Sequence, residues 1–537
     1  MDEPSRVPGS PDTMMLTVKV RDLQPLPGLS NDEHRSASDL IQALLDAFAT
    51  APPHRLDFDE LAAVASHLRT IGDPAAAETL ADMAAHRFLE RSETTNAIAL
   101  YNMAGLACFD QGALEDAGHH FMKALSLIPS PDSRLQTPVL LINHATVMTE
   151  MGGYEQALLL YERTIRELDS SPPGSYGQRD ALLPQQVRGL VTNNIGWVLL
   201  RSARAAGNDR ELIARAVTSF DAALQLPLHP RTRLITWGNR AEASIMLGET
   251  ESAAAALTTM EAECLSAGYQ KLLPEAYRRR AQLEAAMGNV DTAIEWTLKA
   301  MQTSIQEANP RQELRIVEVF LDILHDVVSR AADPYLALES SGATVVSQIV
   351  ALLESKDTYT GGSHSRRVAE LARRIACRMV GDGPGQQKWV KRVELGGLFH
   401  DVGKLRIPWS LLNRVPRLSR RDWELLKAHT TTGEAILRDL GLWSLALVAG
   451  GHHERPDGAG YPRGDTRSTI EAAIVAAADS FDAMASPSRL YTLPKTFAEA
   501  LAEVQRGSGT QFRPDIVEAL VAVVDETRVT PELSHIS

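Results

Sequence analysis

The sequence predicts an all-α fold, in which an α-solenoid of helical hairpins precedes an all-helical C-terminal domain. Aromatic residues make up only 5% of the 537 residues and alanine is abundant, which favours helix over strand. Small residues recur about every 40 residues through the first half, as expected for stacked helical repeats. In the last third, histidines and aspartates gather in and around helical stretches.

Composition narrows the class of protein. Hydrophobic residues (44%) and charged residues (23%) are close to the globular average, which excludes wholesale disorder. The net charge of −14 argues against a nucleic-acid polymer as partner. Cys108, Cys264 and Cys377 lie far apart, so neither a disulfide framework nor a thiolate metal site is predicted. Without a signal peptide or an apolar run of ~20 residues, we expect a cytoplasmic protein with no membrane partner.

The chain is predicted to have four segments. Residues 1–38 are rich in proline, serine, glycine and charge, and are expected to form a disordered leader. Residues 39–308 carry the repeats, residues 309–349 form connecting helices, and residues 350–530 form the C-terminal domain.

One segment of the repeat region shows the motif most clearly. Its marked positions are Tyr101, Gly105, Gly112, Ala117, Phe121, Ala124 and Pro129. This spacing resembles the tetratricopeptide motif, in which small residues allow close helix packing and aromatic residues fill the groove between hairpins. The resemblance implies a concave surface for a protein or peptide that the sequence does not identify. We expect His119 and His120 to face solvent, without a metal role.

Equivalent small residues mark six copies of the repeat. They are Ala65, Gly105, Ala145, Gly196, Ala241 and Ala281. Most successive spacings are about 40 residues, longer than the 34 of the standard motif. The sequence therefore predicts longer helices or turns and an irregular solenoid.

The connecting segment contains one amphipathic helix, predicted over residues 312–328. Ile316, Phe320, Ile323 and Val327 form a heptad-like stripe on it. This stripe either packs on the last repeat or forms the seam of a homodimer.

The C-terminal domain concentrates residues suited to binding metal. The candidate ligands are His364, His400, Asp401, His429, His452, His453 and Asp479. Imidazole and carboxylate donors without thiolate suit iron, manganese or zinc. Seven donors exceed the need of one ion, so two divalent ions sharing a carboxylate are expected.

Longer strings around these residues resemble a known family. They are the H-D-x-G-K string from His400 to Lys404, the string H-H-E-R-P-D-G-A-G-Y-P from His452 to Pro462, and Gly509 to Phe512. Residues from about 350 to 525 look like an HD-GYP domain, the branch of the HD phosphohydrolase superfamily that degrades bis-(3′-5′)-cyclic dimeric GMP (cyclic di-GMP).

The resemblance implies a role for each motif residue. His364, His400, Asp401 and Asp479 would hold one ion, and Asp401 would bridge to a second ion completed by His429, His452 and His453. Asp401 and Lys404 would be catalytic, with the Lys404 ammonium reaching the scissile phosphate. The loop next to the site would be shaped by Arg455, Asp457 and Tyr461. These residues would either contact the substrate or only stabilise the loop.

Two departures from the family pattern concern metal count and substrate grip. Trinuclear members place a glutamate where this chain has Thr360, so a third ion is not expected. The family binds its substrate with two basic residues in this segment, the substrate clamp. Here one of the two is missing, because Arg489 is followed by Leu490-Tyr491-Thr492. Lys495 is the candidate replacement.

The expected function is a cyclic di-GMP phosphodiesterase that releases linear pGpG, GMP or both, regulated by a partner bound to the repeats. One alternative is a signalling adaptor with weak activity. Such an adaptor would bind either the nucleotide or a GGDEF-type cyclase. Another is a phosphohydrolase of a different nucleotide, such as cyclic GMP-AMP.

Overall fold

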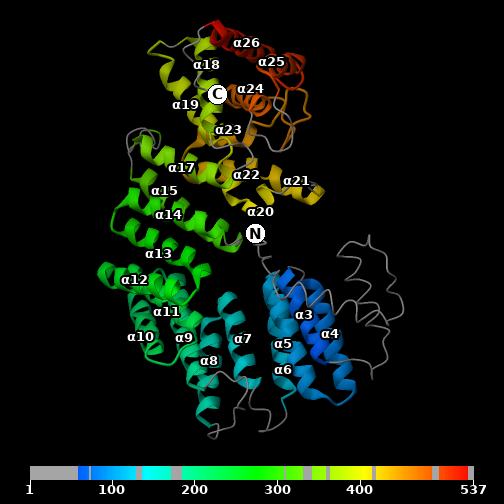
Figure 1. Ribbon diagram of the computed structural model, residues 1–537, viewed down its shortest axis with the longest axis vertical. Helices are drawn as coiled ribbons and strands as arrows, with labels where there is room; N and C mark the ends of the chain where they lie inside the picture. Colours follow the sequence, from blue (N-terminus) through cyan, green and yellow to red (C-terminus); the bar gives the residue numbers. More distant parts are fainter. Residues whose placement is uncertain are drawn as a thin grey trace, which may run out of the picture. The chain divides into compact units, whose positions relative to one another are not determined.

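A computed structural model describes most of the chain. The described residues are 58–71, 74–128, 136–170, 184–306, 310–330, 335, 342–357, 363–381, 383–413, 419–486 and 495–529. The predicted leader (1–38), Pro129, Thr360 and the segment 489–492 lie outside them. The regular elements of the described residues are all helices, with one isolated backbone bridge and no strand among them, as predicted (Figure 1). None of these helices combines the length and apolar character needed to cross a bilayer.

The chain divides into two compact units, residues 1–247 and 248–537. The helices of the first unit are α3 (Phe58–Ile71), α4 (Pro74–Glu90), α5 (Thr94–Gln111), α6 (Leu114–Ser126), α7 (Gln136–Glu150), α8 (Tyr154–Ser170), α9 (Pro184–Ala205), α10 (Arg210–Leu224) and α11 (Pro230–Leu247). Successive helices pair as α3/α4, α5/α6, α7/α8 and α9/α10. The longest helix of this unit is α9, which has 22 residues and carries the small residue Gly196.

The small residue of each predicted repeat lies buried on the first helix of its copy. At Gly105 an added Cβ would lie 2.6 Å from the Phe121 ring, so the glycine makes room for the aromatic side chain of the next helix. Gly196 and Phe220 repeat this arrangement at 2.7 Å. Phe121 therefore fills its own hairpin, rather than the groove between hairpins.

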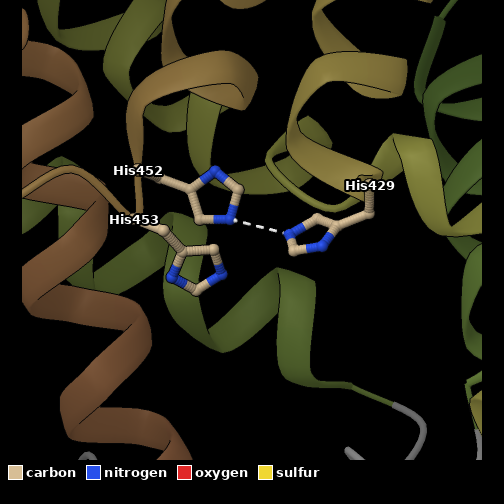
Figure 2. Close-up of side chains that lie close together, drawn as sticks. All are labelled: His429, His452 and His453. Carbon is tan, nitrogen blue, oxygen red and sulfur yellow. Dashed lines mark hydrogen bonds between the residues drawn. The ribbon is translucent and has the colours of Figure 1, made fainter. Parts of the chain in front are cut away.

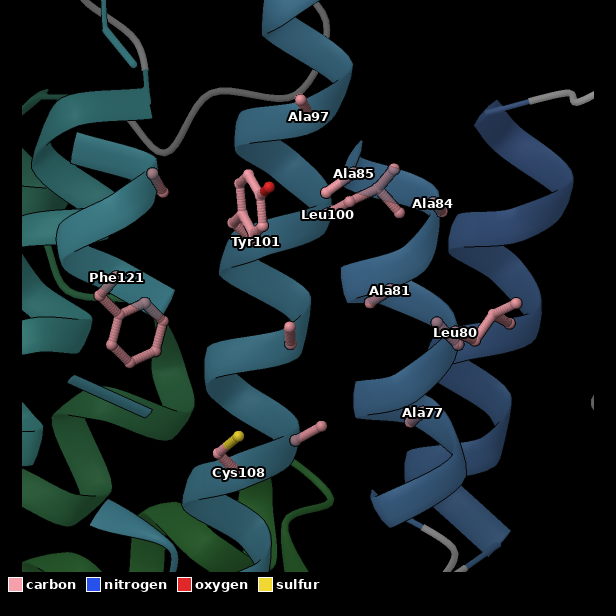
Figure 3. Close-up of a cluster of buried hydrophobic side chains, with 14 of the residues drawn as sticks. Ala77, Leu80, Ala81, Ala84, Ala85, Ala97, Leu100, Tyr101, Cys108 and Phe121 are labelled. Atoms are coloured by element: carbon pink, nitrogen blue, oxygen red, sulfur yellow. The ribbon is translucent and has the colours of Figure 1, made fainter. Parts of the chain in front are cut away.

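The core of the first hairpins is built from small side chains. Figure 3 shows Ala77, Ala81 and Ala84 with Tyr101 and Cys108, all buried between the helices. Alanine lets the backbones of α4 and α5 approach closely, and these two helices share the most extensive contact among the described helix pairs. Gly112 ends α5 with a φ of 80°, a conformation that favours glycine.

The expectation for the two adjacent histidines of α6 was half right. His119 is exposed, but His120 is only 9% exposed. On a helix, neighbouring residues point about 100° apart, so one of the pair faces solvent while the other turns towards α4 and α5.

The second unit contains the last helices of the repeat region and the C-terminal domain. Its elements are α12 (Thr250–Ser266), η2 (Gln270–Leu272), α13 (Leu273–Ala286), α14 (Val290–Gln306), α15 (Pro310–Ser329), α17 (Gly342–Lys356), α18 (His364–Val380), α19 (Gln387–Phe399), η3 (Val402–Arg406), α20 (Trp409–Leu412), α21 (Arg420–Lys427), α22 (His429–Asp439), α23 (Trp443–Gly451), α24 (Ile470–Ala485), α25 (Phe497–Arg506) and α26 (Pro514–Val529). Val368, Ile375, Ile474 and Leu520 are central to the core that α18, α24 and α26 share.

The amphipathic stripe of the connecting helix is covered within the chain. Ile316, Phe320 and Ile323 of α15 are buried, and α15 packs on α13 and α14. This agrees with packing on the last repeat, and leaves these three side chains no free surface for a dimer seam.

Candidate metal centre

The candidate ligands lie mostly at helix ends. His364 and His429 begin α18 and α22, while His400 and His452 directly follow α19 and α23. Asp479 lies within α24, and Asp401 precedes η3. Because α23 ends at Gly451, His452 and His453 lie beyond the helix, and their side chains need not point about 100° apart. Their ring centroids lie 4.1 Å apart.

The structure gathers six of the seven side chains into two groups. Within each group, one ligand atom per residue lies within 4.8 Å of the others. The first group is His364, His400 and Asp401, and the second is His429, His452 and His453, whose imidazoles converge in Figure 2. Asp479 joins the first group, with Oδ1 3.2 Å from His364 Nε2.

Asp401 lies between the two groups. Its Oδ2 is 3.2 Å from His400 Nε2, whereas its Oδ1 is 3.4 Å from His429 Nε2. Each carboxylate oxygen thus faces a different group, which is the arrangement that a carboxylate shared by two cations requires.

Backbone contacts fix the tautomers of three histidines. In His400, His429 and His452, Nδ1 lies 2.8, 2.7 and 2.9 Å from the carbonyl oxygen three residues earlier. A carbonyl only accepts, so Nδ1 donates, and Nε2 of the neutral ring carries the lone pair. The Nε2 atoms of His429 and His452 lie 3.3 Å apart (Figure 2). The buried Nε2 of His400 has no hydrogen-bond partner among the described residues, as expected of a metal-ligating atom.

Burial and neighbouring charges shift the pKa values of the candidate ligands. Burial lowers the pKa of His453 to about 4 and the pKa of His452 well below its usual value, so both are neutral. Burial opposes ionisation of Asp401, but the charges of His400 and Lys404 outweigh it and hold the pKa of Asp401 well below the usual range. In the first group burial again disfavours the charged imidazoles, but the neighbouring carboxylates outweigh it, raising the pKa of His364 to about 9 and the pKa of His400 above its usual value.

Asp482, which is not among the residues predicted from the motifs, orients one of the candidate ligands. Its Oδ2 lies 2.8 Å from His364 Nδ1, and Arg367 donates to both carboxylate oxygens at 2.6 and 2.9 Å. A carboxylate behind a histidine ligand fixes its tautomer and raises its basicity. The signal was present, because Asp482 follows Asp479 by three residues and therefore shares its helix face.

Lys404 is held between two carboxylates. Its Nζ lies 2.7 Å from Asp401 Oδ2 and 2.7 Å from Asp357 Oδ2. Burial disfavours the ammonium, but the two carboxylates outweigh this effect and raise the pKa of Lys404, so it keeps its charge. In this structure the lysine neutralises and positions Asp401.

Lys356, the residue before Asp357, anchors the chain around η3, which contains Lys404. Lys356 is fully buried, and its Nζ donates to the carbonyl oxygens of Leu405 and Ile407 at 2.8 and 2.7 Å. Glu313 of α15, also buried, lies 3.2 Å from this ammonium. The end of α17 thus ties η3 to α15, which no local sequence pattern indicated.

Gly403, in the H-D-x-G-K string, allows η3 to lie directly on α22. A Cβ at this position would be 1.9 Å from the His429 carbonyl oxygen and 2.6 Å from the Gly433 nitrogen. Only glycine permits this approach, which brings Asp401 within reach of His429.

The glycine-rich loop after His453 forms one wall of a cavity of about 200 Å³. Tyr461 stacks on His453 with ring centroids 4.6 Å apart, and Arg455 and Gln511 also line the cavity. Arg455 donates to Asp457 Oδ1 at 2.9 Å, so these two residues staple the loop as well. Gln511 was not singled out as a site residue, although its segment carries the family resemblance.

Lys495, the candidate replacement in the substrate clamp, lies at the edge of the described residues. Its ammonium is 2.7 Å from Glu503 Oε2, and its backbone nitrogen donates to the Met484 carbonyl oxygen at 2.9 Å. The other candidate, Arg489, lies outside the described residues.

Comparison with known proteins gives the class of this region. Residues 348–516 match the family model described as the HD domain, so the C-terminal unit contains an HD domain. A cyclic di-GMP phosphodiesterase of Thermotoga maritima is 38% identical over 180 residues, 33% of this chain and 47% of that protein. The 3′3′-cGAMP-specific phosphodiesterase 3 of Vibrio cholerae is 34% identical over 179 residues, 33% of this chain and 38% of that protein.

Both matches leave more than half of the relative uncovered. Among solved structures, BtubC from P. vanneervenii is similar over 48% of this chain and 93% of its own, with 14% identity and a TM-score of 0.34.

Proposed function

We propose that this protein is a metal-dependent phosphodiesterase that hydrolyses cyclic di-GMP to linear pGpG, GMP or both. The position of Asp401 carries the proposal, because its two oxygens face two separate groups of imidazoles. The phosphodiesterase relatives support the reaction class, and the HD domain match over residues 348–516 includes this centre.

The proposed ligands fall into two sets. His364, His400, Asp401 and Asp479 would hold one divalent ion, and Asp401, His429, His452 and His453 the other. The donor set of nitrogen and oxygen fits iron or manganese best and also admits zinc. Two such ions supply Lewis acidity towards the phosphate and lower the pKa of water, which makes a nucleophile available near neutral pH.

The remaining residues of the site have positioning and binding tasks. Lys404 contacts Asp401 and is close enough to the centre to stabilise charge developing on phosphate oxygens. The Tyr461 ring, packed on His453, offers a face on which a guanine can stack. Arg455, Arg489 and Lys495 are the candidate cations for the second phosphate of the substrate.

The test is a measurement of metal content followed by a turnover assay. Protein purified without chelating resin should contain about two divalent ions per chain and hydrolyse cyclic di-GMP. Asp401→Ala should lose metal and activity, whereas Asp439→Ala, an exposed carboxylate at the end of α22, should keep both. Unchanged metal content and rate in Asp401→Ala would disprove the shared carboxylate.

A second substrate deserves the same assay. One of the relatives is named for 3′3′-cGAMP, and its matched region is almost as long as that of the cyclic di-GMP relative. Both dinucleotides present two phosphates and at least one guanine, so a stacking wall and a cation could serve either. Comparison of kcat/KM for the two substrates decides between them.

We also propose that a protein or peptide partner at the repeats regulates the activity, and that the protein is cytoplasmic. The alternative is an adaptor that binds cyclic di-GMP, or a GGDEF-type cyclase, with little turnover. Binding of cyclic di-GMP to the metal-loaded protein, without hydrolysis, would favour the adaptor. A homodimer stays a prediction, to be measured by light scattering.

A further inference from the structure

A second cluster of metal-binding side chains lies in the repeat unit. Glu78 of α4, Cys108 of α5 and His120 of α6 each offer one ligand atom, and these atoms lie within 4.8 Å of one another. Cys108 and His120 are buried, while the side chain of Glu78 is 30% exposed. An ion could therefore enter from the carboxylate side and reach the thiol and imidazole below.

The imidazole of His120 lies between two carboxylates. Its Nε2 is 3.7 Å from Glu78 Oε1, and its Nδ1 is 3.6 Å from Asp82 Oδ1. Both separations are too long for good hydrogen bonds, and the buried Nδ1 has no hydrogen-bond partner among the described residues. Ligand atoms around a tetrahedral zinc ion with bonds of about 2.1 Å are themselves about 3.4 Å apart.

We infer that Glu78, Cys108 and His120 Nε2 bind a zinc-like divalent ion. Thiolate, imidazole and carboxylate together form a donor set that zinc accepts in tetrahedral sites. Asp82 faces Nδ1 of the same imidazole, where a carboxylate orients a histidine ligand and leaves Nε2 free for the metal. The three ligands come from three successive helices, so the ion fastens α4, α5 and α6 together.

Asp82 suits the orienting role better than a role as fourth ligand. It also lies 3.6 Å from His86 Nδ1 and 3.8 Å from Lys123 Nζ, so its charge is shared among three cationic or polar groups. The fourth position on the ion is left to water. The competing explanation is an ion pair of protonated His120 with both carboxylates, in which the Cys108 thiol stays protonated and donates a hydrogen bond to Glu78; burial and this contact raise the pKa of the thiol to about 12.

Cobalt(II) distinguishes the two explanations in the full-length protein. A thiolate bound to cobalt gives an intense charge-transfer band in the near ultraviolet, and the centre in the C-terminal unit has only nitrogen and oxygen donors. We expect the band to saturate at one equivalent of thiolate-bound cobalt under reducing conditions. Cys108→Ser and His120→Gln should abolish it, and zinc should displace the cobalt.

Two matched controls separate the site from general damage. His119→Gln changes the exposed neighbour on the same helix, and Cys264→Ser changes another buried cysteine. Both should keep the band. Glu78→Gln, at the partly exposed rim, should fold normally and weaken cobalt binding at least tenfold.

The inference fails if wild-type protein shows no thiolate band with excess cobalt, or if the band survives in Cys108→Ser. If either buried variant fails to fold by circular dichroism, Glu78→Gln decides, and unchanged cobalt affinity in that variant overturns the site.

Discussion

Gly403→Ala tests whether the contact between η3 and α22 sets the spacing of the candidate metal centre. The new Cβ would lie 1.9 Å from the His429 carbonyl oxygen, whereas ordinary contact begins at 3.4 Å. Because the obstacle is backbone, η3 and α22 must separate by about 1.5 Å. Overpacking of this kind costs about 1–3 kcal/mol, and the absence of a movable side chain places this case at the upper end.

The same shift acts directly on the proposed ligands. Asp401 lies two residues before Gly403, and its Oδ1 is now 3.4 Å from His429 Nε2. Metal sites tolerate deviations of about 0.2 Å in ligand distance. We therefore expect the variant to lose at least one of its two ions and about 100-fold in kcat, the effect of a displacement of about 1 Å in an active site.

The assay combines metal analysis, turnover of cyclic di-GMP and thermal unfolding. Gly385→Ala is the matched control, because a Cβ there, in the turn before α19, meets nothing within 4 Å. Wild-type metal content and turnover in Gly403→Ala would refute the reasoning, and would mean that η3 adjusts without moving Asp401.

Three further changes test other contacts. Lys404→Ala should keep its metal but lose about 10²-fold in kcat, because it removes a charge beside the reacting phosphate rather than a ligand; loss of metal would make the lysine structural. Glu313→Ala leaves the Lys356 ammonium buried without its carboxylate and should destabilise the second unit by about 3–5 kcal/mol in urea unfolding, whereas an unchanged midpoint would show that the carbonyl contacts suffice. Glu275 is partly buried, yet the charges of Arg279 and Arg278 outweigh the effect of burial and lower its pKa, so its stabilisation is present above its ordinary pKa of 4.5 and is lost as the pH falls below that value. The melting temperature of Glu275→Gln should therefore lie below wild type at pH 7 and approach it on acidification; a constant difference would contradict the assignment.

The repeats and the donor set could be predicted because their patterns are local. Small residues such as Gly105 and Gly196 must lie where two helices of one hairpin touch, so they recur along the chain with the hairpin itself. The histidines of the C-terminal domain could be recognised by their residue type and by the sequence motifs that contain them. The family resemblance also implied two sets that share Asp401, and the structure adds the distances, with each oxygen of Asp401 facing one set.

The partners of these residues were decided only by tertiary structure. Asp482 reaches His364 across 118 positions, and Asp357 reaches Lys404 across 47. Helical periodicity shows which face of a helix is apolar or charged, but not which distant helix lies against that face. For the same reason the burial of His120 beside Glu78 and Cys108 was missed, since their three helices meet through packing that no single stretch of sequence encodes.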